Sequence, residues 1–361
     1  MFNPAKPYNT LPLLPPDRKK IETVPVLRQE SKAAVALAEL KGLAKTLPNP
    51  SILVNSIVLK EAKASSEIEN VITTHDKLYQ ALTLKSAEVD KDTKEVLRYR
   101  EALFTGQKFI RQKGFLNTNG IVKVQKELEQ NDAGIRKLPG TALKNDARGK
   151  IIYTPPDNPE AIQRLMKNFD EFINTHDDDL PVLVKLAIQH YQFESIHPFY
   201  DGNGRTGRIV NVLYLMMNNL LDSPILYLSG YINKNKSAYY RLLQEVRTKD
   251  KWEEWILFML KSVEQTSLET IKQIHDINKL FNKTLEQVRK EASAIYSKEL
   301  IEALFEQPYC RIEFLIERLS VSRRSASTYL NVLTKAGILE SKTIGRDTVF
   351  INKALYNFFK K

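Results

Sequence analysis

Apolar residues recur at helical spacing through most of this 361-residue chain, and this periodicity constrains the fold more than any other feature. Good helix formers such as Ala, Leu, Glu and Lys fill the same segments, as in LRQESKAAVALAELKGLA. Almost no strand-like alternation appears before residue 338. We therefore predict a mainly α-helical protein, with helices near residues 27–44, 51–72, 74–84, 91–113, 117–130, 159–174, 180–195, 205–220, 234–247 and 251–290.

Three segments depart from this pattern. Residues 1–26 are punctuated by proline and are predicted to lie extended over the surface. Residues 134–160 are rich in Gly, Pro, Asn and Asp, and their only extended piece predicts a short β-hairpin at Lys150, Ile151, Ile152 and Tyr153. After about Tyr296 the order is helix, helix, a short SVS turn, helix and two strands around Gly345, which predicts a winged helix-turn-helix.

Composition excludes several classes of protein. No apolar run reaches the roughly 18–20 residues that cross a bilayer, and the N-terminus lacks the apolar stretch of a signal peptide. The single cysteine, Cys310, excludes an intramolecular disulfide framework, so we expect a cytoplasmic protein without membrane contact. The formal charge of +11 favours anionic partners such as nucleotides, nucleic acid or acidic proteins, and lysines on solvated helix faces are the alternative explanation.

The segment HPFYDGNGRTGR, residues 197–208, carries the clearest chemical signal. It contains GxGxxG, but the residues before it have helical spacing and Pro198 excludes a strand entering the loop, so a dinucleotide-binding fold is rejected. Glycines that lead into a helix N-terminus let backbone N–H groups approach an anion. We expect a phosphate site formed by Asp201, Gly202, Asn203, Gly204, Arg205, Gly207 and Arg208.

His197 stands at the edge of this predicted site, four residues before Asp201. A neutral imidazole titrates close to neutral pH and can accept the proton of a hydroxyl group that attacks a phosphate. Asp201 supplies a hard carboxylate oxygen, which suits Mg²⁺ held mainly by phosphates and water. His197 is therefore the candidate general base, and Asp201 the candidate Mg²⁺ ligand.

The twelve residues fit the signature HPFx(D/E)GNGRxGR without a mismatch and so resemble Fic-domain proteins. The resemblance implies a helical core that transfers AMP from ATP to a Ser, Thr or Tyr hydroxyl of a target protein, or of the enzyme itself. Gly204 favours AMP transfer, because a related phosphorylating branch has Lys at that position. The resemblance also implies that Arg208 reaches the γ-phosphate and that the α- and β-phosphates are bound by Gly202, Asn203, Gly204, Arg205, Thr206 and Gly207.

Two other segments fit the same resemblance. The hairpin at 150–153 lies where the family has a flap that lines the nucleotide and aligns the target by strand addition, and an ordinary surface hairpin is the alternative. Residues 229–247 resemble the segment that lines the adenine, with Tyr239 and Tyr240 either as contacts or as core residues. Arg247 stands where some members have Asn, which leaves base selectivity undecided.

The predicted domain organisation follows from these assignments. It comprises an N-terminal helical region at 1–112, a catalytic core at 113–255, a helical connector at 256–292 and the winged helix at 293–361.

SSEIEN, residues 65–70, fits the pattern (S/T)xxxE(G/N) of an inhibitory helix in Fic proteins, with Ser65, Glu69 and Asn70. Ser65 and Glu69 are i, i+4 neighbours on one helix face. A bidentate ion pair from Glu69 to Arg208 would occupy the guanidinium meant for the γ-phosphate, so ATP would bind with its α-phosphorus misaligned. In some relatives the same glutamate positions a water that removes AMP, so de-AMPylation is a second predicted activity.

A zinc hydrolase is one alternative. His190, Glu194 and His197 share one helical face at spacing i, i+4, i+7 and could bind Zn²⁺. Pro198 ends that helix at the third ligand, however, and the glycines and arginines that follow would be left unexplained.

A nucleotide-sensing, DNA-binding regulator is the other alternative. Arg323 and Arg324 begin the predicted recognition helix, and Lys342 and Arg346 lie in or near the wing, where they could contact phosphates. Winged helices also dock proteins, so either DNA or a protein is an expected partner here. A homo-oligomer is expected as well.

Overall fold

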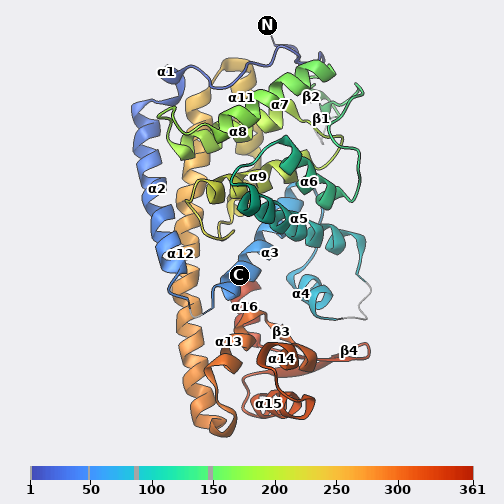
Figure 1. The fold of residues 1–361 in the computed structure, drawn as a ribbon, viewed down its shortest axis with the longest axis vertical. Helices are drawn as coiled ribbons and strands as arrows, with labels where there is room; N and C mark the ends of the chain where they lie inside the picture. The colour runs from blue at the N-terminus through green and yellow to red at the C-terminus, as the bar shows by residue number, and fades with distance from the viewer. Residues whose placement is uncertain (1, 48, 85–88, 145–148, 361) are drawn as a thin grey trace.

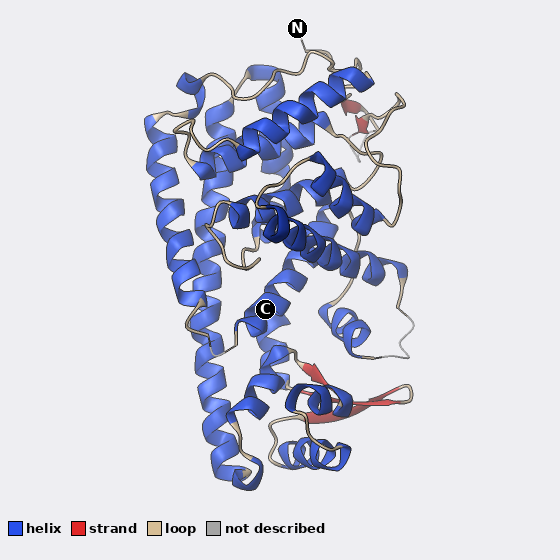
Figure 2. Ribbon diagram, viewed as in Figure 1, coloured by secondary structure: helices blue, strands red, loops and turns tan. Residues whose placement is uncertain are grey.

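A computed structural model describes residues 2–47, 49–84, 89–144 and 149–360, and these form a helical body above a smaller C-terminal module (Figure 1). The mainly helical fold is confirmed, and the strands of the described residues lie in two small antiparallel sheets (Figure 2). The elements of the body are α1 Arg18–Ile21, α2 Val24–Ala44, α3 Pro50–Ile68, α4 His75–Thr83, α5 Lys91–Lys113, α6 Thr118–Glu129, β1 Leu143–Lys144, β2 Ile151–Tyr153, α7 Pro159–Asn174, α8 Val182–Ile196, α9 Asn203–Met217, α10 Leu228–Lys234, α11 Lys236–Lys249 and α12 Trp252–Glu291.

Helices α8 and α9 form the centre of the body, and residues 197–202 join them. Every residue of α8 except Val182 is buried, polar residues such as Lys185 and Gln189 included, so the helix is enclosed on all sides. Helices α3, α5 and α6 pack on α9, while α7 and α12 pack on α8. The loop between the two central helices therefore opens inside a framework of helices.

Two long helices, α2 and α12, run side by side along one edge of the body (Figure 1). With 40 residues, α12 is about 60 Å long at roughly 1.5 Å per residue. It continues past the body to the C-terminal module. The predicted boundary at 255/256 falls inside this single helix.

The C-terminal module comprises α13 to α16, residues 298–360. Its β-sheet has the order β3–β5–β4, and β4 and β5 pair from Glu340↔Ile351 to Ile344↔Asp347 around a turn at Gly345, whose φ is +61°. The order of helices and strands is the one that the sequence predicts, and β3 and α16 are additional elements. The module consists of α13 Lys298–Glu306, β3 Tyr309–Cys310, α14 Ile312–Leu319, α15 Arg323–Lys335, β4 Glu340–Ile344, β5 Asp347–Ile351 and α16 Lys353–Lys360.

Three local predictions need correction. Lys150 lies outside the hairpin, whose strands are β1 and β2, with Leu143 opposite Tyr153. The expected helix at 234–247 is α11, and the sequence did not predict α10, which precedes it and is separated from it by Asn235 with φ −119° and ψ 29°. The proline-rich N-terminal segment contains the short helix α1, although the Leu14 amide donates to Asn168 Oδ1 at 2.7 Å and holds the segment on α7 as expected.

Candidate active site

The loop at 197–202 has a conformation that its own residues fix. His197 ends α8 in the left-handed region, with φ +50°, and its amide donates to the Phe193 carbonyl at 2.9 Å. The side chain of Asn203 bonds both the amide and the carbonyl of Phe199, each at 2.8 Å. Phe199 is fully buried. Asn203 was expected to bind a phosphate, and in this structure it instead closes the loop.

The N-terminus of α9 is an anion site by geometry. Gly202 precedes the helix with φ +75°, and no side chain caps the first N–H groups, so these donors and the helix dipole face the loop. The carboxylate of Glu69 lies directly against Gly204, where a Cβ would overlap Oε1 of Glu69. Glycine is required at 204 because the anionic group approaches the backbone so closely.

Glu69 pairs with Arg208, as the sequence predicts, but through one carboxylate oxygen rather than two. Nη2 of Arg208 donates to Oε1 of Glu69 at 2.8 Å. Ser65 accepts the other bonds of Arg208, from Nε to its hydroxyl at 2.7 Å and from Nη2 to its carbonyl at 2.9 Å. The predicted bidentate pair is thus wrong, because the serine one turn earlier on α3 takes the second position.

Charge stabilises this arrangement on both sides. Burial favours the neutral form of Glu69, but the positive charge of Arg208 and its hydrogen bond outweigh burial and hold the pKa of Glu69 below its ordinary value. Burial likewise opposes the charge of Arg208, and Glu69 outweighs it, so the pKa of Arg208 is raised. Both groups are therefore charged at neutral pH.

His197 is held neutral. Burial, followed by the charges of Arg136 and Arg247, lowers the pKa of His197 to about 4. Its Nδ1 is buried and has no hydrogen-bond partner among the described residues. Arg136 donates from Nε to the His197 carbonyl at 2.7 Å and from Nη2 to the Ile196 carbonyl at 3.2 Å, which fixes the backbone beneath the imidazole. A neutral imidazole on a fixed backbone is suited to accept a proton.

Arg205 does not point toward the anion site. Its two terminal nitrogens bond Glu95 of α5 and, at 2.9 Å, Glu129 of α6. Oε1 of Glu129 also lies beneath Gly202, where a Cβ would overlap it. The expected role of Arg205 as a phosphate ligand has no support here, because both forks of the guanidinium join the loop to neighbouring helices.

Asp201 fits the expected Mg²⁺ ligand. It is exposed at the mouth of the loop, and Oδ1 accepts the Gly202 amide at 2.7 Å, which leaves Oδ2 available. Among the described residues no three His, Cys, Asp or Glu side chains converge on one point. The alternative zinc site is absent there, since His190 Nε2 is bonded to the hydroxyl of Tyr239 at 2.9 Å.

The tyrosines expected near the nucleotide differ in exposure. Tyr239 is buried in the core against Trp255, while Tyr240 is exposed at the surface. Tyr153 is buried and donates to the Ser195 carbonyl at 2.6 Å, with Arg247 4.0 Å from the centre of its ring. Tyr239 and Tyr153 are therefore core residues here, whereas Tyr240 and the half-buried Ile151 and Ile152 remain candidates for a ligand-facing surface.

The sequence did not reveal several residues of the site. Glu61, one turn before Ser65, is buried and accepts the amide of Ser229 at 2.9 Å and the Tyr99 hydroxyl at 3.2 Å, which joins α3 to α10 and α5. Glu194 is buried three residues before His197, and its Oε1 has no hydrogen-bond partner among the described residues. Burial raises the pKa of Glu194 to about 7.

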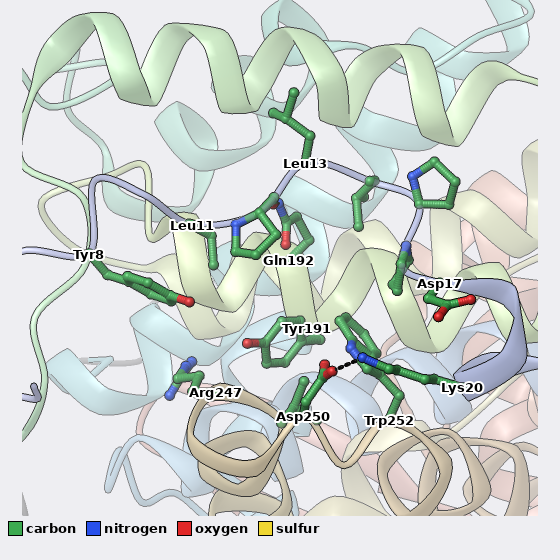
Figure 3. A pocket seen from close by; sticks show the side chains of 15 residues that line it. Tyr8, Leu11, Leu13, Asp17, Lys20, Tyr191, Gln192, Arg247, Asp250 and Trp252 are labelled. Carbon is green, nitrogen blue, oxygen red and sulfur yellow. Dashed lines mark hydrogen bonds and ion pairs between the residues drawn. The ribbon is translucent and has the colours of Figure 1, made fainter. Parts of the chain in front are cut away.

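A cavity of about 410 Å³ lies beneath the N-terminal segment, on the side of α8 that Figure 3 shows. Leu11 and Leu13 roof it, and Tyr191, Arg247 and Trp252 form its floor. No residue of 197–208 lines it. The cavity is therefore separate from the anion site at α9, although Arg247 reaches both the cavity and Ser195.

Comparisons with known proteins agree with one another. Residues 115–215 match the model of the Fic/DOC family, residues 27–108 match the Fic/DOC N-terminal model, and residues 280–355 match the C-terminal domain of SoFic-like protein adenylyltransferases. The proteins named protein adenylyltransferase Fic from Drosophila virilis and Drosophila melanogaster are 35% identical over 95 residues. That match covers 25% of this chain and 17% of each relative, so the chain spans a small part of their length.

Solved structures show the same fold over more of the chain. A Fic family protein from Desulfovibrio desulfuricans has a TM-score of 0.59 at 18% identity, covering 91% of this chain and 96% of that one. A Fic domain containing signaling protein from Bacteroides thetaiotaomicron has a TM-score of 0.54 at 18% identity, covering 67% of this chain and 95% of that one.

No helix within the described residues has both the length and the apolar content needed to cross a membrane.

Proposed function

The chain belongs to the Fic/DOC family, and we propose that it is a protein adenylyltransferase, which transfers AMP from ATP to a hydroxyl side chain of a target protein and of itself. The observation that carries the proposal is the Glu69 carboxylate against Gly204 at the uncapped N-terminus of α9. A negative group accepted at that point supports a site for a phosphate. The neutral imidazole of His197 begins the same segment and supports a reaction that starts by removing a proton.

The proposed chemistry uses these groups in order. Backbone N–H groups at the start of α9 bind the phosphates, and Arg208 binds the γ-phosphate once Glu69 has left. His197 accepts the proton of the target hydroxyl, whose oxygen bonds to the α-phosphorus while the bond from phosphorus to pyrophosphate breaks. The products are AMP-modified protein and pyrophosphate. Asp201 would hold Mg²⁺, which neutralises part of the phosphate charge when bound.

We further propose that the conformation with Glu69 on Arg208 is an autoinhibited state of the enzyme. Glu69 pairs with the guanidinium of Arg208 and lies over Gly204. The γ-phosphate of ATP would therefore find Arg208 already paired and the space beside it filled. A displaced γ-phosphate would rotate the α-phosphorus away from in-line attack, and near-attack geometry controls several kcal/mol of the barrier.

The test is incubation with ATP radiolabelled at the α-phosphorus. Wild type should label itself weakly, Glu69→Gly strongly, and His197→Ala in the Glu69→Gly background not at all. ATP labelled at the γ-phosphorus is the control, since AMP transfer leaves that label in pyrophosphate. Labelling from the γ-position would show that the reaction is phosphorylation and not AMP transfer.

Three other predictions await their own tests. Removal of AMP by the same site would appear as AMP released from purified modified target. DNA contact through Arg323, Arg324, Lys342 and Arg346 would appear as a mobility shift that weakens steeply with salt. A homo-oligomer would appear in the sedimentation of the purified chain.

A further inference from the structure

The C-terminal module packs on the helix before and the helix after the inhibitory residue Glu69. Helix α13 contacts α3, which contains Ser65 and ends at Ile68 directly before Glu69, and β3 contacts α4, which follows (Figure 1). Six residues, 69–74, separate the end of α3 from the start of α4. The inhibitory glutamate therefore lies between two surfaces on which the module docks.

The contact with α3 is polar and lies at its N-terminal end. Glu306, the last residue of α13, accepts the side-chain amide of Asn49 at 2.6 Å through Oε1. The Glu306 carbonyl accepts the side-chain amide of Asn55 at 3.3 Å. Arg318 of α14 donates to the same Oε1 of Glu306 at 2.6 Å, which holds that carboxylate in place.

The contact with α4 is aromatic. The Tyr309 hydroxyl of β3 donates to Oδ1 of Asp76, and the Tyr309 ring stacks on that of Tyr79 with centroids 5.9 Å apart and an interplanar angle of 11°. Tyr356 of α16 meets both rings edge-on, and Arg311 donates to the Thr83 carbonyl at 3.3 Å. Both ends of α4 are thus bonded to the module.

Apolar burial joins the same elements. A small cluster separate from the main core draws Leu59 from α3, Tyr79 from α4, and Tyr309, Val349 and Ile351 from the module. Because its members come from all three parts, the module cannot move away without exposing α3 and α4 side chains. Undocking would therefore expose apolar side chains of α3 and α4 to water, which costs free energy.

The segment between the docked helices is short and ends the inhibitory helix. The amides of Glu69 and Val71 both donate to the Ser66 carbonyl at 3.0 Å, and Asn70 adopts a left-handed φ of +63°. The deeply buried α3 cannot translate as a whole, so Glu69 leaves Arg208 most easily when this last turn unwinds. Docking of α4 limits that unwinding.

We propose that the C-terminal module is a regulatory element of the active site: its docking on α3 and α4 keeps the last turn of α3 wound and Glu69 on Arg208, and its undocking releases the inhibition. This inference rests on the proposed function for its effect on catalysis. Its effect on the structure of residues 66–76 does not depend on that function.

The experiment uses the full chain with Tyr309→Phe, which removes the bond to Asp76 and keeps the ring. Asp76→Ala removes the acceptor and tests the same bond from the other side. The matched control is Tyr329→Phe in α15, whose hydroxyl has no hydrogen-bond partner among the described residues. Hydrogen exchange at the amides of 66–76 and self-labelling from α-labelled ATP are measured for each.

Tyr309→Phe and Asp76→Ala should each raise exchange at 66–76 about fivefold, a size typical of one lost hydrogen bond, and the double variant should add nothing further. Both should raise self-labelling severalfold in the wild-type background and leave it unchanged in Glu69→Gly. Unchanged exchange, or an equal rise in the Glu69→Gly background, would overturn the inference. If no variant labels at all, the proposed function fails, and exchange still decides whether the module holds the turn.

Discussion

Replacing Glu69 by Gln separates charge from obstruction in the inhibited site. The substitution keeps the length and shape of the side chain, so the amide still lies against Gly204 and an oxygen still faces Nη2 of Arg208. Only the negative charge is lost. Glu69→Gly removes both the charge and the obstruction.

The expected magnitudes follow from the geometry of the pair. A hydrogen bond between charged groups contributes about 1.5–3 kcal/mol, and the lower value applies because the Glu69 side chain is 36% exposed while that of Arg208 is 2% exposed. Gln keeps a hydrogen bond to the charged guanidinium but loses the attraction between opposite charges, which at about half of that value is about threefold in the equilibrium. Gly loses all of it, at least about tenfold.

The assay is the initial rate of self-labelling from α-labelled ATP, with the order wild type, Glu69→Gln, Glu69→Gly. Glu67→Gln is the matched control, because Glu67 bonds Lys63 and Asn233 rather than Arg208. If Glu69→Gln labels like wild type while Glu69→Gly is fully active, obstruction over Gly204 rather than charge on Arg208 silences the site. Equal rates for all three variants would refute the inhibitory role of Glu69 altogether.

Three further predictions follow from burial and charge. Because the pKa of His197 is lowered to about 4, kcat/KM of Glu69→Gly should stay flat from pH 8 to about pH 5, and a titration near 6.5 would contradict the neutral imidazole. The pKa of Glu194 is about 7 in the folded protein and about 4.5 in the unfolded chain, so Glu194 binds its proton more tightly when folded. The free energy of unfolding should therefore fall by about 3 kcal/mol as pH rises through this window. Glu194→Gln should abolish this slope in thermal unfolding. Arg205→Ala should lower the free energy of unfolding by about 3 kcal/mol, because Glu95 and Glu129 are left facing each other, 19% and 13% exposed, and Arg205→Lys should recover part of it.

Helix ends were predictable where local chemistry marks them. Helix α5 spans the predicted 91–113 because the Asp90 side chain caps its first turn and Gly114 ends it with φ +77°. Helix α7 spans the predicted 159–174 because Asn158 caps it and Pro159 starts it. Helix α10 was missed, since no side-chain cap marks its start and only one residue separates it from α11.

The residues of the site also differ in how far the sequence could predict their partners. Glu69 and Arg208 were predictable as a pair only through the resemblance, whose motifs bring together positions 139 residues apart. The true partners of Arg205 lie 110 and 76 residues away in sequence, on helices whose placement no local pattern gives. Glu61 reads from sequence as one more charged residue of a helix, and only the packing of α10 makes it a buried acceptor for Ser229.

The bond between Asn203 and Phe199 has a consequence for how fast the protein can respond. A loop that is already ordered by its own side chain has no folding step to complete when a nucleotide arrives. The delay before activity is then set by how often the last turn of α3 unwinds and the Glu69 carboxylate leaves Arg208, a local unfolding event that takes microseconds to seconds. Cellular control would thus act on the lifetime of the contact between Glu69 and Arg208, while the loop at 197–202 stays folded throughout.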